Sequence, residues 1–230
     1  MLSRVADAIF WMSRYMERTK VETTLLLTNY TAIQDNAIEN NWDLIFDQYG
    51  HSKVKVDNQM KIWKSSELLT HLITDKENPS SIANNIIAAR ENARSVQDNI
   101  TKELWQTLNN FYHIVKSTEN EYKLVNEDPV DVMDNIINQC YLYYGIIDIT
   151  IARGEGYHFM NIGKYIERAI QTINVLCIKL KEIELNIADD ANILSFRYAL
   201  YALSGYELFG KTYKGAMSCS NMIHHILFNP

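Results

Sequence analysis

Apolar residues, with two threonines, recur at alternating steps of three and four over two long stretches of the chain. The first stretch contains Leu2, Val5, Ile9, Met12, Met16, Thr19, Thr23, Leu26, Tyr30 and Ile33. The second contains Phe159, Ile162, Ile166, Ala169, Ile173, Leu176, Leu180, Ile183 and Ile187. This spacing is typical of a long amphipathic helix whose apolar seam faces a partner. The pattern therefore predicts two long helices with inward-facing seams.

A short charged motif occurs once in each of these helices. The two copies are Ser13–Arg18 (SRYMER) and Gly163–Arg168 (GKYIER), and they occupy the same position relative to the apolar seam. The shared register predicts a duplicated helix, with its two copies related by a rough two-fold axis. The first helix also carries apolar residues outside its seam, among them Val21 and Leu25, which predicts a central position in a bundle.

Weaker apolar patterns and boundary residues predict further helices between and after these two. Helices are expected over residues 41–49, 65–72, 81–100, 101–115 and 129–151, with Ser81 or Ser80 and Thr101 as caps and a bend at Thr101. Residues 51–59, 75–79 and 119–128 are expected to be loops, and 154–156 a break. A last segment starts near Asp189, with an interruption at Gly215. Strands have almost no support, so the fold class is an all-α multi-helix bundle.

Composition supports this fold class. Of 230 residues, 47% are apolar, only 8 are glycine and 3 are proline, which favours helices over sheets with many tight turns. The sequence predicts one helical domain over residues 1–230. A net charge of −6 argues against a uniformly basic nucleic-acid surface. Three scattered cysteines, no signal peptide and no run of about 20 apolar residues predict a cytoplasmic protein without a membrane span.

The charges of the two motifs need partners, because an unpaired buried charge costs several kcal/mol. Within the first copy, Arg14 and Glu17 are spaced to pair one helical turn apart. In the middle of the chain, Arg90 and Arg94 would repel each other by about 0.2–0.5 kcal/mol. They are expected to share an anion, either Glu17 or Glu167. The predicted cluster comprises Arg14, Glu17, Arg18, Arg90, Glu91, Arg94, Lys164, Glu167 and Arg168.

Such a cluster has a structural and a functional interpretation. It can be a buried lattice that fixes the register of three helices. Alternatively, its bases outnumber its acids, and a pocket with surplus positive charge would hold a carboxylate or a phosphate. An enzyme could use Glu17 or Glu167 as an acid-base group. A structural homo-oligomer would instead leave a large apolar face uncovered.

The residues expected of common catalytic sites are missing from the sequence. There is no glycine-rich phosphate loop, no nucleophile motif and no metal-ligand spacing, and the histidines are scattered. The sequence therefore predicts no metal and no cofactor, and it favours a protein that is not an enzyme.

Three blocks with the charged motifs lie in order along nearly the whole chain. They are residues 1–7 with 11–18, residues 89–96 (ARENARSV) with Trp105 and Leu108-Asn109, and residues 159–169 (FMNIGKYIERA). In these blocks the chain resembles the bacterial alpha-E family, which is named for its helices and its Glu-Arg motif. The resemblance implies that Glu17-Arg18, Arg90-Glu91-Asn92-Arg94 and Glu167-Arg168 are the signature positions.

The resemblance also implies a context. Genes of this family typically lie beside those for ATP-grasp ligases and transglutaminase-like proteases, which suggests a role in peptide synthesis or modification. The leading expectation is a non-catalytic module that binds an ATP-grasp peptide ligase or its peptide substrate, with a transglutaminase-like protein as another partner.

Two departures from the family pattern carry further expectations. Asn161 and Lys164 stand where the family commonly has leucine and arginine, so a bidentate contact is not expected there. Family members continue past Phe228 with further helix, so this chain is expected to lack a C-terminal tail and to leave a groove open.

Overall fold

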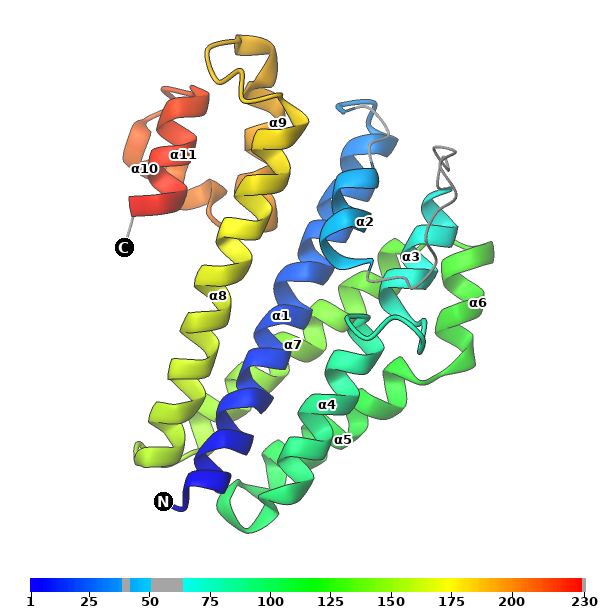
Figure 1. Cartoon of the computed structure of the whole chain (residues 1–230), viewed down its shortest axis with the longest axis vertical. Coiled ribbons are helices and arrows are strands. Elements are labelled where there is room, and N and C mark those ends of the chain that lie inside the picture. The colour runs from blue at the N-terminus through cyan, green and yellow to red at the C-terminus, as the bar shows by residue number, and fades with distance from the viewer. Residues whose placement is uncertain (39–41, 51–63, 229–230) are drawn as a thin grey trace.

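The computed structural model describes residues 1–38, 42–50 and 64–228, which form a bundle of helices (Figure 1). Within these residues the chain forms eleven α-helices and two short 3-10 helices, without a strand. The α-helices are α1 (Ser3–Gln34), α2 (Asp43–Tyr49), α3 (Ser65–Ile73), α4 (Ile82–Ser95), α5 (Lys102–Val115), α6 (Thr118–Asn126), α7 (Val130–Thr150), α8 (Glu155–Glu182), α9 (Ile193–Ala202), α10 (Tyr206–Tyr213) and α11 (Cys219–Phe228). The 3-10 helices are η1 (Gln97–Asn99) and η2 (Asp190–Asn192). The all-α prediction is confirmed.

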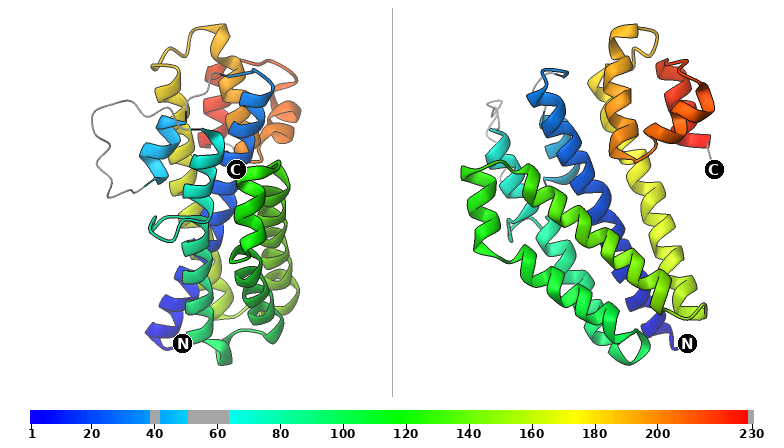
Figure 2. Two further views of the ribbon diagram at one scale, coloured as in Figure 1. Left: turned by 90° about the vertical axis from the view of Figure 1, so that its right-hand side faces the viewer. Right: turned by 180° about the vertical axis from the view of Figure 1, so that it is seen from behind.

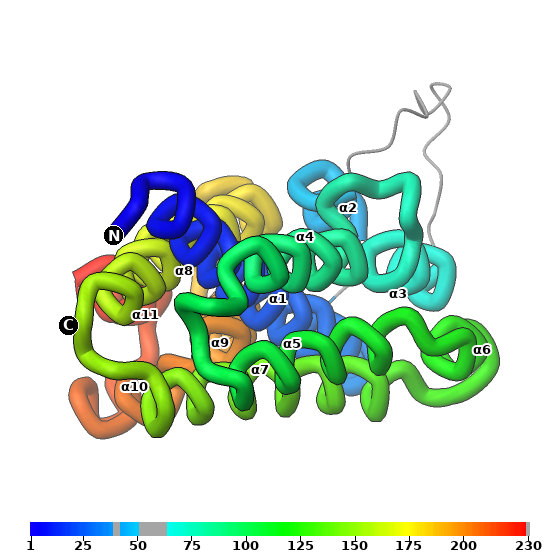
Figure 3. Tube along the Cα trace, turned by 90° about the horizontal axis from the view of Figure 1, so that it is seen from below, coloured from blue at the N-terminus to red at the C-terminus, as the bar shows by residue number. Residues whose placement is uncertain are grey.

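The first long helix, α1, is the centre of the bundle and contacts α3, α4, α7, α8 and α9. Figure 3 shows it enclosed by α4, α7 and α8. Its predicted seam is buried from Val5 to Leu26, and Val21 and Leu25 are buried on another face. Because several faces of α1 are apolar, only a position surrounded by other helices removes all of them from water.

Side-chain caps start the helices in the middle of the chain. The Ser81 hydroxyl accepts a hydrogen bond from the Asn84 N–H at the start of α4, and Thr101 accepts one from the Leu104 N–H at the start of α5. Because α4 ends at Ser95 and η1 leads to α5, the bend predicted near Thr101 is confirmed. Seen from behind in Figure 2, α7 runs diagonally across the bundle.

The stretch 119–128 was predicted to be a connector, and this prediction is wrong, because most of it forms α6. Ser117 caps this helix by accepting a hydrogen bond from the Glu119 N–H. α6 packs against α3 and α7, and Leu124 is its one buried residue. A helix that buries a single side chain leaves almost no apolar periodicity in its sequence, which explains the error.

Three boundaries also bear on the predictions. α8 begins at Glu155, so Gly156 lies inside the helix and not in a break. The last segment is interrupted twice, at Gly215 as predicted and at Ser204, which has a left-handed φ of 58°. The predicted helix start at Asn41 and the predicted loop 51–59 lie outside the described residues.

The apolar seam predicted for α8 faces inward only in its C-terminal part, where Leu176 is buried, as is Ile183 just after the helix. From Ile162 to Ile173 the seam is exposed, which corrects that part of the prediction. The buried face of α8 instead includes Met160, Gly163, Glu167, Gln171, Val175 and Ile178. The exposed apolar side chains, which we call the outer stripe, are Ile162, Tyr165, Ile166, Ile170 and Ile173, each with 42% to 56% of its surface accessible. α8 lies at the edge of the bundle, so only the face toward α1, α2 and α9 is covered.

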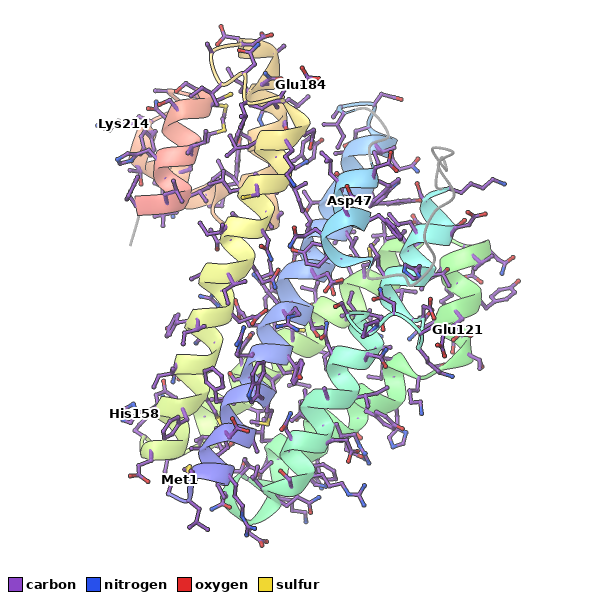
Figure 4. The ribbon with its side chains drawn as sticks, in the orientation of Figure 1. Met1, Asp47, Glu121, His158, Glu184 and Lys214 are labelled. Carbon is purple, nitrogen blue, oxygen red and sulfur yellow. The ribbon has the colours of Figure 1, made fainter. Side chains whose placement is uncertain are left out.

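The helices α1 and α8 run side by side in the same direction and begin at the same end of the bundle (Figure 1). Figure 4 places Met1 and His158 together at that end, where the amino group of Met1 forms an ion pair with Glu155. The two motif copies therefore face each other at the same height.

None of the helices in the described part of the chain combines the length and the hydrophobicity that a membrane span needs.

Candidate functional site: the paired Glu-Arg motifs

The two motif copies exchange ion pairs across the α1–α8 interface. Arg18 donates from Nε to Glu167 Oε1 at 2.7 Å and from Nη2 to Oε2 at 3.2 Å. Arg168 donates from Nε to Glu17 Oε1 at 2.7 Å and from Nη2 to Oε2 at 3.2 Å. Each arginine thus makes a bidentate contact with the glutamate of the other copy, the strongest common form of ion pair. The equal distances show a local two-fold relation between the copies.

The neighbours of the two glutamates break this symmetry. Glu167 accepts further hydrogen bonds from Arg14 Nε at 2.7 Å and from Gln171 Nε2 at 2.8 Å. Glu17 instead accepts a hydrogen bond from the Tyr144 hydroxyl of α7. The sequence interpretation paired Arg14 with Glu17, and this is wrong, because the Arg14 side chain crosses to α8. Glu167 therefore has two guanidinium partners and Glu17 has one.

Both carboxylates are closed to solvent. The side chains of Glu17 and Glu167 have no accessible surface, whereas that of Arg168 is 47% exposed. Burial by itself would raise the pKa of Glu167, but hydrogen bonds from Arg18 and Gln171 and the charge of Arg18 hold it below its ordinary value. The pKa of Arg18 is raised, because its contact with Glu167 outweighs its burial. Both groups therefore stay ionised as a fixed pair.

The predicted residues of the middle helix form a separate cluster. Arg90 donates to Asn109 at 2.9 Å and to Glu91 at 2.7 Å, and Arg94 lies 3.5 Å from Glu91. The Arg90 guanidinium also lies 4.5 Å from the ring centre of Tyr112. The expectation that Arg90 and Arg94 share Glu17 or Glu167 is wrong. An acid adjacent in the sequence and a neighbouring helix satisfy them instead.

Lys164 takes part in the site without an ion pair among the described residues. Its ammonium lies 4.6 Å from the ring centre of Tyr165 and 5.6 Å from that of Tyr144. These are distances of cation–π contacts. Since Tyr144 donates to Glu17, Lys164 is linked to the first copy through an aromatic ring and not through a bidentate contact.

Several residues of the site were absent from the prediction. Gln171 connects Glu167 to α2, because its Oε1 accepts a hydrogen bond from the Tyr49 hydroxyl at 2.8 Å. Glu22, one turn after Arg18, is fully buried, and neither of its oxygens has a hydrogen-bond partner among the described residues. One signal was readable for Gln171 and Glu22: each lies four residues beyond a motif residue on the same helix face. Tyr144 and Tyr49 come from other helices and carried no such signal.

The comparison with known proteins adds the family. The model of the alpha-E family, described as a predicted alpha-helical domain with a conserved ER motif, matches residues 1–230. The chain is a member of the alpha-E family. No curated protein and no solved structure matches it. The all-helical fold of this alpha-E chain agrees with the family description, and no group of side chains that could hold a metal ion lies in the described ranges.

Proposed function

We propose that this alpha-E chain is a non-catalytic module that binds a partner protein through the outer stripe of α8. The observation that carries the proposal is the exposure of four isoleucines and a tyrosine along one helix face. From Ile162 to Ile173 the stripe extends about 16 Å along the helix. Single exposed apolar residues are ordinary, but a contiguous row of them is typical of a protein interface.

A groove next to the stripe gives it charge as well as apolar surface. This groove has a volume of about 590 Å³ and includes Ile162 itself, with Phe10 and Phe159 among its apolar walls. Asp7 supplies a carboxylate at its lining, whereas that of Glu155 is paired with the amino group of Met1. The complementary partner is therefore an apolar surface with a basic group opposite Asp7.

An ATP-grasp peptide ligase is the partner that we favour. The support is the family resemblance, because alpha-E genes typically accompany those of ATP-grasp ligases. A transglutaminase-like protein from the same gene neighbourhood is the second partner of this kind, and both would place the complex in the cytoplasm. In this role the Glu-Arg motif of this chain would hold α8 in the orientation that presents the stripe. The motif residues are Glu17-Arg18 and Glu167-Arg168.

The geometry argues against acid-base catalysis by the two glutamates. A catalytic acid or base must come within hydrogen-bond reach of a substrate proton. Both oxygens of Glu17 and both of Glu167 already accept hydrogen bonds from the protein, and both side chains are inaccessible. A substrate could reach them only after the ion pairs separate.

Co-purification tests the proposal. The chain is expressed together with an ATP-grasp ligase from the same genome. It is used unchanged, as the double variant Ile166→Asp/Ile173→Asp, or as the control Ile149→Asp. Ile149 is 82% exposed on α7, so the control adds an aspartate to another exposed apolar site. We expect the unchanged chain and the control to retain the ATP-grasp protein and the double variant to lose it.

Two results would contradict the proposal. Equal retention by all three proteins would show that the stripe is not the interface. If light scattering of the unchanged chain alone shows a dimer that only the double variant converts to a monomer, the stripe serves a second copy of the chain and not a ligase.

A further inference from the structure

A second cavity is lined by the Glu17–Arg168 ion pair, where α1, α8 and the turn between α9 and α10 meet. It has a volume of about 230 Å³. Its polar lining consists of Glu17 and Lys20 from α1, Arg168 and Thr172 from α8, and Ser204 from the turn. None of these residues belongs to the outer stripe, so the cavity is independent of the partner surface proposed above.

Lys20 is the unusual residue of this cavity. It is a lysine with only 9% of its surface accessible, and its ammonium makes one hydrogen bond, to the Ser204 hydroxyl at 3.2 Å. No carboxylate pairs with it among the described residues. Since an ammonium has three donors, two of them have no acceptor among the described residues. A buried cation without an anion is a costly arrangement, and a bound anion would relieve the cost.

The other groups of the cavity do not supply that anion. Glu17 is the one carboxylate in the lining, and its two oxygens already accept hydrogen bonds from Arg168 and Tyr144. Arg168 uses Nε and Nη2 for Glu17, and its Nη1 makes no hydrogen bond within the described part of the chain. The hydroxyl of Thr172 is also without a hydrogen bond there. The cavity therefore combines surplus positive charge with unused donors.

We propose that this cavity binds a small oxyanion, namely the carboxylate or phosphate group of a small molecule. Lys20 supplies a point charge, Arg168 supplies its free Nη1, and the hydroxyl of Thr172 supplies a neutral donor. Val21 and Leu203 form an apolar part of the wall. This part suits a short hydrocarbon chain next to the anionic group.

The groups around Lys20 also predict how binding depends on pH. The groups that face Lys20 are Glu17 on α1, Arg168 on α8 and Cys140 on α7. Burial lowers the pKa of Lys20 and Arg168 lowers it further, while Glu17 partly opposes them. An oxyanion binds to the charged ammonium and not to the neutral amine. Its affinity should therefore fall as the pH rises through the pKa of Lys20 in the empty protein.

Calorimetric titration of the full chain with inorganic phosphate, acetate and butyrate tests the proposal. We expect saturable binding of at least one of these anions, with butyrate tighter than acetate if the site takes carboxylates and phosphate tightest if it takes phosphates. Lys20→Met should weaken binding at least tenfold. Lys102→Met is the matched control, because it removes the charge of an exposed lysine on α5 and should bind as the unchanged chain does.

Ser204→Ala provides a milder second variant in case Lys20→Met does not fold, as judged by its thermal melting. It removes the hydroxyl partner of Lys20 and leaves the charge, so it should alter affinity by a few-fold and preserve the pH dependence. Absence of saturable binding by the unchanged chain would overturn the proposal. Equal affinities for Lys20→Met and Lys102→Met, or for all three anions, would overturn it as well.

Discussion

A Cβ atom on Gly163 would lie 2.4 Å from the carbonyl oxygen of Phe10, so α8 meets the backbone of α1 at this point. No side chain fits at such a distance. The contact lies one turn before Glu167 and sets how closely the two motif copies approach. We expect Gly163→Ala to push the helices apart and to lower the free energy of unfolding by about 1–3 kcal/mol, measured by urea denaturation.

Gly145 provides the control for this substitution. It lies inside α7, and a Cβ there would meet no atom within 4 Å. Because glycine inside a helix is less favourable than alanine, Gly145→Ala should raise the free energy of unfolding by about 0.5–1 kcal/mol. If both substitutions changed stability in the same direction, close helix contact at Gly163 would not be the cause.

Replacement of Glu167 by glutamine should destabilise the protein strongly. The variant leaves the charges of Arg14 and Arg18 without their carboxylate, and loss of one partner of a buried pair costs about 3–5 kcal/mol. Because the arginines are partly exposed, about 3 kcal/mol is the expected loss in urea denaturation at neutral pH.

The pH dependence of the same variant gives a second measurement. The pKa of Glu167 is lowered by folding, so its stabilising contribution is present above the pKa of the unfolded chain and is lost as pH falls through the folded pKa. Glu167→Gln should lack this acid-induced loss. Glu91→Gln is the control, since Glu91 is half-exposed between Arg90 and Arg94 and its loss should cost no more than about 1 kcal/mol. Equal losses for the two variants would show that the Glu167 pair is not special.

Tyr144 should matter because it completes the hydrogen bonding of Glu17. Tyr144→Phe removes a donor to a buried carboxylate, which costs about 1.5–3 kcal/mol. Tyr141→Phe, on an exposed site of the same helix, should change stability by less than about 0.5 kcal/mol. The difference between their urea midpoints measures the contribution of the hydrogen bond, and equal midpoints would contradict it.

The parts of the fold that were predictable depended on local signals. Nearby residues in the sequence were enough to predict the seam of α1 and the caps at Ser81 and Thr101. The repeated motif likewise indicated that Glu17 and Glu167 would meet. The seam is determined by helix periodicity and each cap by a single hydrogen bond to a nearby backbone group, whereas the meeting of the two glutamates was indicated by the repeat.

The features that were not predictable depend on which helix lies beside which. The seam of α8 has the same register as that of α1, but its part from Ile162 to Ile173 lies on the outer side of the bundle, where no helix of the described ranges covers it. The predicted pairing of Arg14 with Glu17 was wrong for a similar reason. Glu17 lies one turn away on the same helix, whereas the actual partner, Glu167, lies across the interface. Periodicity defines the faces of a helix and does not say which face is covered.

Glu22 is the group whose pH dependence should oppose that of Glu167. It is fully buried on α1, and neither oxygen has a hydrogen-bond partner in the described ranges. Burial raises its pKa well above the ordinary value; Arg18 partly opposes this, and Glu167 adds to it. The folded protein therefore keeps Glu22 protonated at pH values where the unfolded chain releases the proton.

This difference makes Glu22 a source of instability that grows with pH. Between the two pKa values the folded state binds one more proton than the unfolded state, so stability falls by about 1.4 kcal/mol per pH unit. Glu22→Gln removes the ionisation, and it should be more stable than the unchanged chain at pH 7 and similar to it near pH 4. Urea denaturation at several pH values measures the difference. A constant difference at all pH values would mean that Glu22 does not titrate on unfolding, because only a pKa that changes with folding produces the slope.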